Sequence, residues 1–268
     1  MKFSLRLLSL VAAGAVAVGS AFPAGAESGR LPNALVGSSY VFPSVANTQG
    51  LFGAFFKTKV TLYNPNSFDI VVEVQLTTAA GAPPTQTIAL AAGGFRRWDN
   101  FLQDVFGFTG GGGLVFTEGS SKVFIAVVEV YVDGPNGRYT TPVTGLLPDD
   151  AILPSSLAPG AIFVAPGIQN NAGNRANFGC LSLAPIASSV RVDFHAFTNG
   201  ARTTASSTLN LQAVAWQQVP VPIAGDDIIA VFGLTTDDPS LIAYCYAVNV
   251  NNASNDGNSI VARRSPPK

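Results

Sequence analysis

The chain has 268 residues, of which 47% are hydrophobic and only 12% are charged, with 15 basic and 16 acidic side chains. So many apolar residues exclude a disordered chain, and so few Lys and Arg residues exclude a nucleic-acid-binding protein. Thr, Ser, Asn and Gln supply most of the polar side chains instead, which suits an exported, β-rich protein.

The first 26 residues have the layout of a secretory signal peptide. Lys2 and Arg6 precede an apolar run over residues 7–18, and residues 24–26 (AGA) form a small-residue cleavage site. The apolar run is shorter than the roughly 20 residues of a membrane-spanning helix. We therefore expect a secreted or periplasmic protein with no integral membrane span after cleavage. Loss of Lys2 and Arg6 leaves 13 basic against 16 acidic residues, a net charge of −3 (13 − 16).

From about residue 40 the apolar side chains recur with a period of two. In IVVEVQL (70–76), the side chains of Val72, Val74 and Leu76 fall on one face and those of Glu73 and Gln75 on the other. Alternation of this kind predicts β-strands with one buried face. Turn-forming dipeptides and tripeptides of Asn, Gly, Pro and Asp separate the predicted strands.

Two short stretches of the first half depart from the strand pattern. DNFLQDVFG (99–107) predicts a short helix with Asp99 or Asn100 as its cap and Gly107 as its end. The run GGGG (110–113) lacks the Lys and the Ser or Thr of a phosphate-binding loop. We expect this glycine run to be a flexible connection before the next strand.

The second half of the chain repeats the first. Residues 60–82 align with 180–202, residues 86–90 resemble 207–211, and residues 124–137 resemble 241–257. A single tryptophan follows the second of these segments in each half, Trp98 and Trp216. The pattern predicts an all-β fold of two tandem antiparallel β-sandwich modules. The modules are expected at residues 40–147 and 161–264, with a Pro-containing linker at 148–160.

Cys180 and Cys245 occupy the positions that Val60 and Val128 hold in the first half. Both valines fall on the apolar faces of their predicted strands, so both thiols should point into the core of the second module. An exported chain meets oxidising conditions, and these are the only two cysteines. We therefore predict a disulfide between them. Two buried, unpaired thiols that act as small apolar side chains are the alternative.

The strand pattern and the Cys180–Cys245 pair resemble the immunoglobulin-like sandwich, in which an early and a late strand are bridged across the core. Trp216 departs from that pattern, because it follows Cys180 by 36 residues (216 − 180) and not by about a dozen. The chain also resembles secreted bacterial proteins of tandem β-sandwiches that have no assigned chemistry. That resemblance implies a fold and an exported location, but no reaction.

The sequence offers little for catalysis or for a cofactor. His195 is the only histidine, and Asp193 lies on the same strand face, but no GxSxG nucleophile motif is present. One histidine and two paired cysteines are too few ligands for zinc. The oxygen-rich segments 133–137 and 251–257 suit either calcium or ordinary turns, and neither has the spacing of an EF-hand loop. We assign no catalytic, cofactor-binding or metal-binding residue.

Aromatic side chains are the candidate ligand or partner surface. They are Phe52, Phe55 and Phe56 in LFGAFF (51–56), together with Trp98 and Trp216. Packing in the core or between the modules, an exposed patch for a partner, and a platform on which sugar rings stack remain alternative interpretations.

The sequence thus predicts a secreted, non-enzymatic binding or structural protein of the cell exterior, with a cell-surface protein or a glycan as its partner. A carbohydrate-binding module protein and a secreted hydrolase with an unrecognised site are the alternatives.

Overall fold

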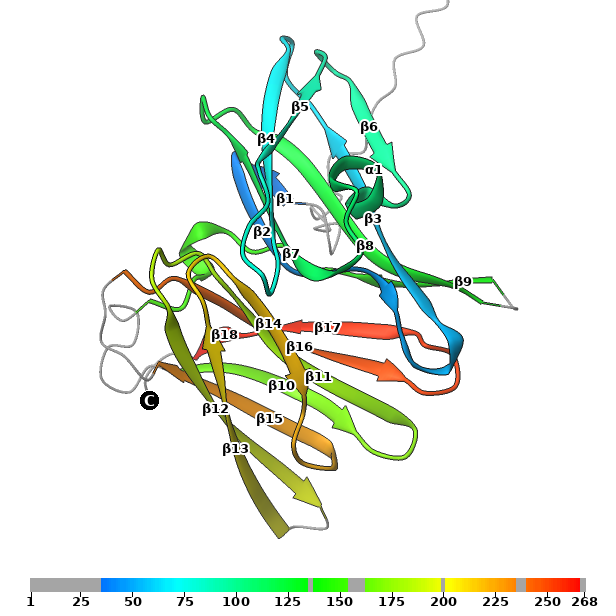
Figure 1. Ribbon diagram of the computed structural model, residues 1–268, viewed down its shortest axis with the longest axis vertical. Coiled ribbons are helices and arrows are strands. Elements are labelled where there is room, and N and C mark those ends of the chain that lie inside the picture. The colour runs from blue at the N-terminus through cyan, green and yellow to red at the C-terminus, as the bar shows by residue number, and fades with distance from the viewer. Residues whose placement is uncertain (1–34, 135–136, 154–161, 199–200, 235–239, 266–268) are drawn as a thin grey trace, which may run out of the picture. The chain divides into compact units, whose positions relative to one another are not determined.

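The computed structural model describes residues 35–134, 137–153, 162–198, 201–234 and 240–265. This part of the chain is all-β, as predicted, and its sheets are antiparallel (Figure 1). The predicted signal peptide, residues 1–26, lies outside the described residues. Within the described ranges, no helix has both the length and the apolar character needed to cross a membrane.

The described part of the first half contains the strands of one β-sandwich and one α-helix. Its elements are β1 (Leu35–Gly37), β2 (Ser39–Gln49), η1 (Leu51–Gly53), β3 (Phe55–Tyr63), β4 (Ile70–Thr77), β5 (Gln86–Leu90), β6 (Phe95–Trp98), α1 (Phe101–Phe106), β7 (Gly110–Glu118), β8 (Phe124–Gly134) and β9 (Gly137–Pro142).

Two sheets enclose the core of the first half. One sheet, the β3 sheet, contains β1, β8, β3, β6 and β9: β8 lies between β1 and β3, β6 pairs with β3, and β9 pairs with β8. The other, the β4 sheet, has the strand order β2-β7-β4-β5. Val72, Val74 and Leu76 of β4 are fully buried while Glu73 is exposed, as the alternation predicted. Val60 and Val128 of the β3 sheet belong to the same apolar cluster, so the buried faces of the two sheets meet.

Strand β2 belongs to both sheets because it bends at a bulge. Its register against β7 shifts between Phe42 and Val45, and its last residues pair with β3. The buried hydroxyl of Thr58 accepts a hydrogen bond from the Ala46 N–H (2.9 Å) and donates one to the Ala46 carbonyl (2.8 Å). One side chain therefore satisfies two backbone groups at the bend.

The predicted helix is confirmed at Phe101–Phe106, where it buries Phe101 and Leu102 against the core. Gly107 ends it in the left-handed region (φ 61°), which favours glycine. Asn100 occupies the N-cap position, as predicted, but it makes no side-chain cap hydrogen bond and instead donates to the Asn47 side chain at 3.1 Å.

The second half is built from η2 (Pro148–Asp150) and a further set of strands. These are β10 (Ile162–Asn170), β11 (Asn174–Ser182), β12 (Ser188–Thr198), β13 (Ala201–Leu211), β14 (Trp216–Pro220), β15 (Gly225–Leu234), β16 (Ala243–Asn251), β17 (Gly257–Val261) and β18 (Arg263–Ser265). A five-stranded sheet has the order β13-β12-β15-β10-β18, and a four-stranded sheet has the order β14-β11-β16-β17.

Six strand pairings of the first half have counterparts in the second half, while β1–β8, β2–β3 and β10–β18 have none. The pairs β2–β7, β3–β8, β3–β6, β4–β5, β4–β7 and β8–β9 have the counterparts β10–β15, β11–β16, β11–β14, β12–β13, β12–β15 and β16–β17. A duplicated module would produce this correspondence. The module bounds 40–147 and 161–264 stay a prediction. The described start of the predicted linker is folded, since the backbone of Ile152 exchanges hydrogen bonds with that of Ala243.

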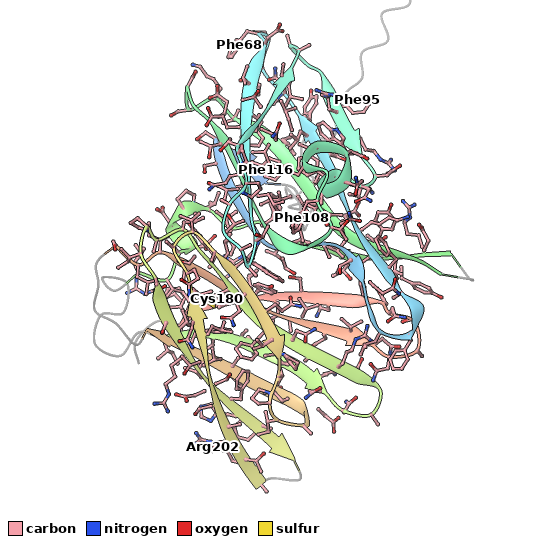
Figure 2. All side chains as sticks on the ribbon, in the orientation of Figure 1. Phe68, Phe95, Phe108, Phe116, Cys180 and Arg202 are labelled. Atoms are coloured by element: carbon pink, nitrogen blue, oxygen red, sulfur yellow. A yellow bond between two sulfur atoms is a disulfide. The ribbon has the colours of Figure 1, made fainter. Side chains whose placement is uncertain are left out.

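The predicted disulfide is confirmed, because Cys180 and Cys245 are bonded to each other inside the second core (Figure 2). They lie directly opposite each other on β11 and β16, as Val60 and Val128 do on β3 and β8. The bridge therefore joins neighbouring strands of one sheet, with a Cα–Cα distance of 4.1 Å. The immunoglobulin-like resemblance implies a disulfide that crosses the core, and this implication is wrong for Cys180 and Cys245.

The two tryptophans lie on corresponding strands but not at corresponding positions. Trp98 lies opposite Val60, whereas the residue opposite Cys180 is Gln217, and Trp216 lies opposite Leu181. The tryptophans are thus one residue out of register, and a shift of one residue places a side chain on the other face of a sheet. Trp98 packs on the core of its own half, while Trp216 faces away from the disulfide core.

Candidate ligand-binding cavity

Trp216 lies where the two halves of the chain contact each other. Its indole Nε1–H donates to the Pro43 carbonyl at 2.9 Å, and its backbone N–H donates to the Thr78 carbonyl at 3.0 Å. Val41 and Leu146 from the first half form one apolar cluster with Leu181 and Tyr244 from the second half. These contacts hold the two halves together through both apolar burial and hydrogen bonds.

The glycine run supplies the space for this contact. Gly110–Gly113 are the first residues of β7, so the predicted flexible connection is wrong. A Cβ atom on Gly111 would lie 2.7 Å from the Trp216 ring, and one on Gly113 would lie 2.9 Å from the Leu181 side chain. The run is therefore a strand whose missing side chains let the second half approach closely.

A cavity of about 350 Å³ lies beside Trp216, between β2, β3, β7, β8 and β9 of the first half and β11, β14, β16 and β17 of the second. Its apolar lining includes Phe56, Trp216 and Val248. Its neutral polar lining includes Thr48, Gln49, Thr141, Asn177, Gln218 and Ser259. A volume of this size falls at the lower end of the range for small-ligand pockets.

Two buried hydroxyl groups border this polar lining. The Tyr246 hydroxyl donates to the Gln218 Oε1 at 2.8 Å, and burial raises the pKa of Tyr246, so that this hydroxyl stays protonated at physiological pH. The Ser259 hydroxyl is also buried, but it has no hydrogen-bond partner within the described chain. A buried polar group without a partner is unfavourable unless a ligand or water meets it.

Arg175 is the one charged side chain among the described residues that line the cavity. Its two terminal nitrogens donate to Asn252 Oδ1 (3.1 Å) and to Asn255 Oδ1 (2.7 Å), and its guanidinium lies 5.8 Å from the centre of the Phe52 ring. Burial lowers the pKa of Arg175, because the charged form loses solvation.

The same contacts account for the second oxygen-rich segment. The side-chain oxygens of Asn252 and Asn255 bind Arg175, and the Asn251 Oδ1 accepts the N–H groups of Ala253 and Ser254. In the first segment the Asp133 carboxylate binds Lys57 and Arg138. Among the described residues, no group of three or more His, Cys, Asp or Glu side chains is placed to hold a metal ion.

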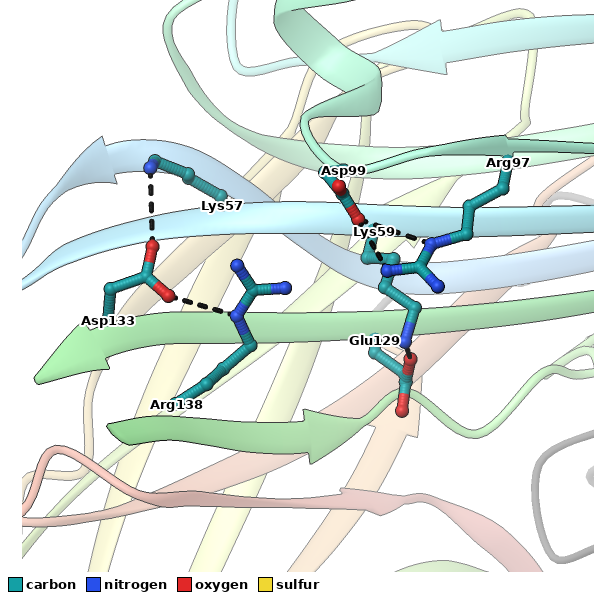
Figure 3. Close-up of polar contacts among 7 residues, drawn as sticks. All are labelled: Lys57, Lys59, Arg97, Asp99, Glu129, Asp133 and Arg138. Carbon is teal, nitrogen blue, oxygen red and sulfur yellow. Dashed lines mark hydrogen bonds and ion pairs between the residues drawn. The ribbon is translucent and has the colours of Figure 1, made fainter. Parts of the chain in front are cut away.

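The β3 sheet carries its charges on an outer face as ion pairs (Figure 3). Lys59 pairs with Glu129 directly across the strands, and Asp133 accepts from Arg138 at 2.9 Å. Arg97 donates to Asp99 at 2.9 Å, and this bond holds the pKa of the Asp99 carboxyl below its usual range. Each of these side chains thus has a partner of opposite charge, in contrast to Arg175.

His195 and Asp193 do not form a catalytic pair. The His195 Nδ1 contacts Arg202 at 2.8 Å, while Asp193 accepts from Ser206 at 2.6 Å and from Arg191 at 3.0 Å. The hydrogen bond from Ser206, followed by that from Arg191, lowers the pKa of Asp193. Each side chain is therefore occupied by a neighbour on the solvent side of the five-stranded sheet, and the nucleophile–base–acid chain of a hydrolase is not assembled there.

The structure separates the five predicted surface residues. Phe56 and Trp216 line the cavity, and Phe52, 72% exposed, contacts Arg175. Phe55 is 37% exposed and lies outside the lining. Trp98 packs edge-on against Phe101, with the ring centres 5.2 Å apart. The tryptophans therefore do not form an exposed, coplanar pair.

The hairpin between β2 and β3 reaches the cavity with its exposed tip. Leu51 lines the cavity and is 59% exposed, and Phe52 follows it with a positive φ of 56°. A bulky residue in this conformation stores backbone strain, a feature that concentrates at functional sites.

Sequence reasoning missed Arg175, Asn177 and Gln218. Arg175 and Asn177 stand in NNAGNRANF (170–178), a polar segment without any recognised binding motif. No local pattern marks these residues, since the cavity forms from strands of both halves.

Comparisons with known proteins identify no family. No family model matches the chain, and no curated protein matches it. Among solved structures, a β-glucuronidase 2 of Bacteroides uniformis, bound to cyclophellitol-6-carboxylate aziridine, matches with 9% identity over 85% of this chain and 26% of that chain, at a TM-score of 0.19. A second Bacteroides uniformis β-glucuronidase structure matches with 8% identity at a TM-score of 0.17. The chain spans about a quarter of the length of these enzymes, and TM-scores this low carry no argument about its fold or its function.

Proposed function

We propose that the protein is an exported, non-enzymatic binding protein of the cell exterior, and that a glycan is bound in the cavity between its two halves. The observation that carries this proposal is the cavity lining. It combines two aromatic rings with amide and hydroxyl groups and a single charge.

The lining suits a hydroxyl-rich ligand. Each amide of Gln49, Asn177 and Gln218 offers both a donor and an acceptor, and a sugar hydroxyl both donates and accepts. Phe56 and Trp216 supply apolar ring faces or edges against which the C–H groups of a sugar can pack. The described lining holds no carboxylate pair, which glycoside hydrolysis requires on either side of the scissile bond. Binding without chemistry is therefore the function that these residues favour.

A glycan array with the mature protein, residues 27–268, tests the proposal. We expect saturable binding to a limited set of glycans. Asn177→Ala, which removes an amide from the lining, should weaken that binding about tenfold, the effect of one or more hydrogen bonds to a ligand. Asn210→Ala, an exposed residue on β13 outside the cavity, should not change it.

Two results would overturn the proposal. Absence of binding to any glycan would remove the ligand class. Release of a shortened product from a bound glycan would show an enzyme instead, and would favour the hydrolase alternative.

A further inference from the structure

The charge on Arg175 has no acidic partner within the described chain. Four other arginines, Arg97, Arg138, Arg191 and Arg263, each form an ion pair with an aspartate. Arg175 instead donates to two neutral amide oxygens. Amide oxygens orient a guanidinium but do not cancel its charge.

The position of Arg175 makes this lack of an acid costly. The side chain is half-buried at the cavity, where the charged form has lost part of its solvation. A buried charge is normally paired with an opposite charge, so this half-buried guanidinium offers its charge to an anionic ligand. A guanidinium has five N–H donors in a planar fork that matches a carboxylate or a sulfate, and the two described bonds leave donors for such a group.

Ser259 lines the same cavity, and its buried hydroxyl oxygen has no hydrogen-bond partner within the described residues. The two asparagines and the Phe52 ring hold the guanidinium in place before any ligand arrives. The site is thus prepared on the protein side for one negative group.

We propose that the ligand of this cavity carries an anionic group, a carboxylate or a sulfate ester, that pairs with Arg175. This inference rests on the proposed function, since it adds the charge of the ligand to the binding of a glycan. The proposal predicts that acidic glycans bind more tightly than neutral glycans of the same core structure, because only the acidic glycans neutralise the charge of Arg175.

The test uses an array on which the same glycan cores are printed unmodified, carboxylated and sulfated. The mature wild-type protein should bind the acidic members of a matched set, and added salt should weaken this binding. Arg175→Gln replaces the guanidinium with a neutral amide that can still donate hydrogen bonds, and it should reduce the affinity for the acidic glycans about tenfold or more. Ser259→Ala should reduce it less.

Arg191→Gln is the matched control. Arg191 is exposed and ion-paired on the five-stranded sheet, which contributes no residue to the described lining, so its loss should leave binding unchanged. Thermal unfolding of each variant shows whether the fold is retained. If Arg175→Gln does not fold, the preference of the wild-type protein for acidic over neutral members decides the question.

The outcomes separate the two proposals. Preference for neutral glycans, or acidic binding that Arg175→Gln leaves unchanged, overturns the anionic ligand while the binding function stands. Absence of binding to every glycan overturns both. Preference for carboxylated over sulfated members, or the reverse, supports the proposal and identifies which anionic group Arg175 binds.

Discussion

Cys180 and Cys245 face each other across two neighbouring strands, at the place where the first half has Val60 and Val128. All four side chains are buried, so each pair fills the same position in its core. The valine pair shows that this position accepts an apolar pair without sulfur. The disulfide therefore adds stability to a second core whose strands are already paired at this position.

Removing the disulfide should cost stability without changing the fold. In the double variant Cys180→Val/Cys245→Val, the apolar contacts remain but the closed loop of 65 residues is lost. The chain-entropy account values such a loop at about 4 kcal/mol, and we expect a loss in the free energy of unfolding of up to that size. Urea unfolding of residues 27–268 measures this loss. Wild-type protein kept in reductant is the control, and a variant as stable as the oxidised wild type would contradict the prediction.

Strand β2 shows at the level of an element how one side chain permits a bend. Its bulge between Phe42 and Val45 lets it leave the β4 sheet and join the β3 sheet. The backbone of Ala46 at this bend is bonded by the hydroxyl of Thr58 on β3. Since β2 also brings Val45, Thr48 and Gln49 to the cavity, the bend helps to place the site.

Thr58→Val should destabilise the protein. The substitution keeps the volume of the side chain but leaves the Ala46 N–H and carbonyl without their partner, at a cost of about 1–3 kcal/mol. Chemical denaturation measures the loss. Thr58→Ser, which restores the hydroxyl, should recover most of the stability, and equal stability of Thr58→Val and the wild type would show that Ala46 needs no partner.

The ion-paired face of β3, β8 and β9 predicts a pH dependence. The hydrogen bond from Arg138, with that from Lys57, holds the pKa of Asp133 below its usual value. A carboxyl with a lowered folded-state pKa stabilises the fold above its unfolded pKa, about 3.9, and this contribution is lost as the pH falls further. Because Asp133 is exposed, the contribution is small, under about 1 kcal/mol.

Asp133→Asn measures this contribution. The wild-type protein should exceed the variant in urea midpoint at neutral pH, and the difference should close as the pH falls below about 4. High salt at neutral pH should also reduce the difference. A difference that stays constant from neutral to acidic pH would show that the Asp133 charge is not responsible.

At the level of the whole molecule, the halves are joined by a shared apolar cluster and by the hydrogen bonds of Trp216. Val41 and Leu146 on one side and Leu181 and Tyr244 on the other would all be exposed if one half unfolded alone. Exposure of that much apolar surface is unfavourable. The structure therefore favours unfolding of both halves in one transition.

The two tryptophans test this cooperativity, because each half has one. In Trp216→Phe the remaining Trp98 reports on the first core, and in Trp98→Phe the remaining Trp216 reports on the contact between the halves. We expect the fluorescence midpoint of each variant to coincide with its own far-UV circular dichroism midpoint. Wild-type calorimetry provides the control, and two separated transitions would contradict a single cooperative unit.

Local patterns carried most of what could be predicted of the fold. A period of two marks a strand with one buried face, and Val60, Val128, Cys180 and Cys245 all obey it, so the direction of the two thiols followed from sequence. Gly107 likewise marked the end of α1, because few residues other than glycine adopt its conformation.

Local patterns failed where a feature depends on distant strands. A single tryptophan follows the same segment in each half, yet a register difference of one residue sends Trp98 and Trp216 to opposite faces. The glycine run looked like a flexible connection because the ring of Trp216, which needs its space, lies about a hundred residues further along the chain.

The amino-acid sequence by itself determined the strands, their buried faces and the pair of inward thiols, because each of these depends on the alternation of neighbouring side chains. Only the tertiary structure decided the contact between the halves, the cavity beside Trp216 and the pairing of Arg175 with neutral amides in place of an acid from the described residues. These features arise when side chains from both halves meet, and no stretch of one strand records which residue of another strand it will face.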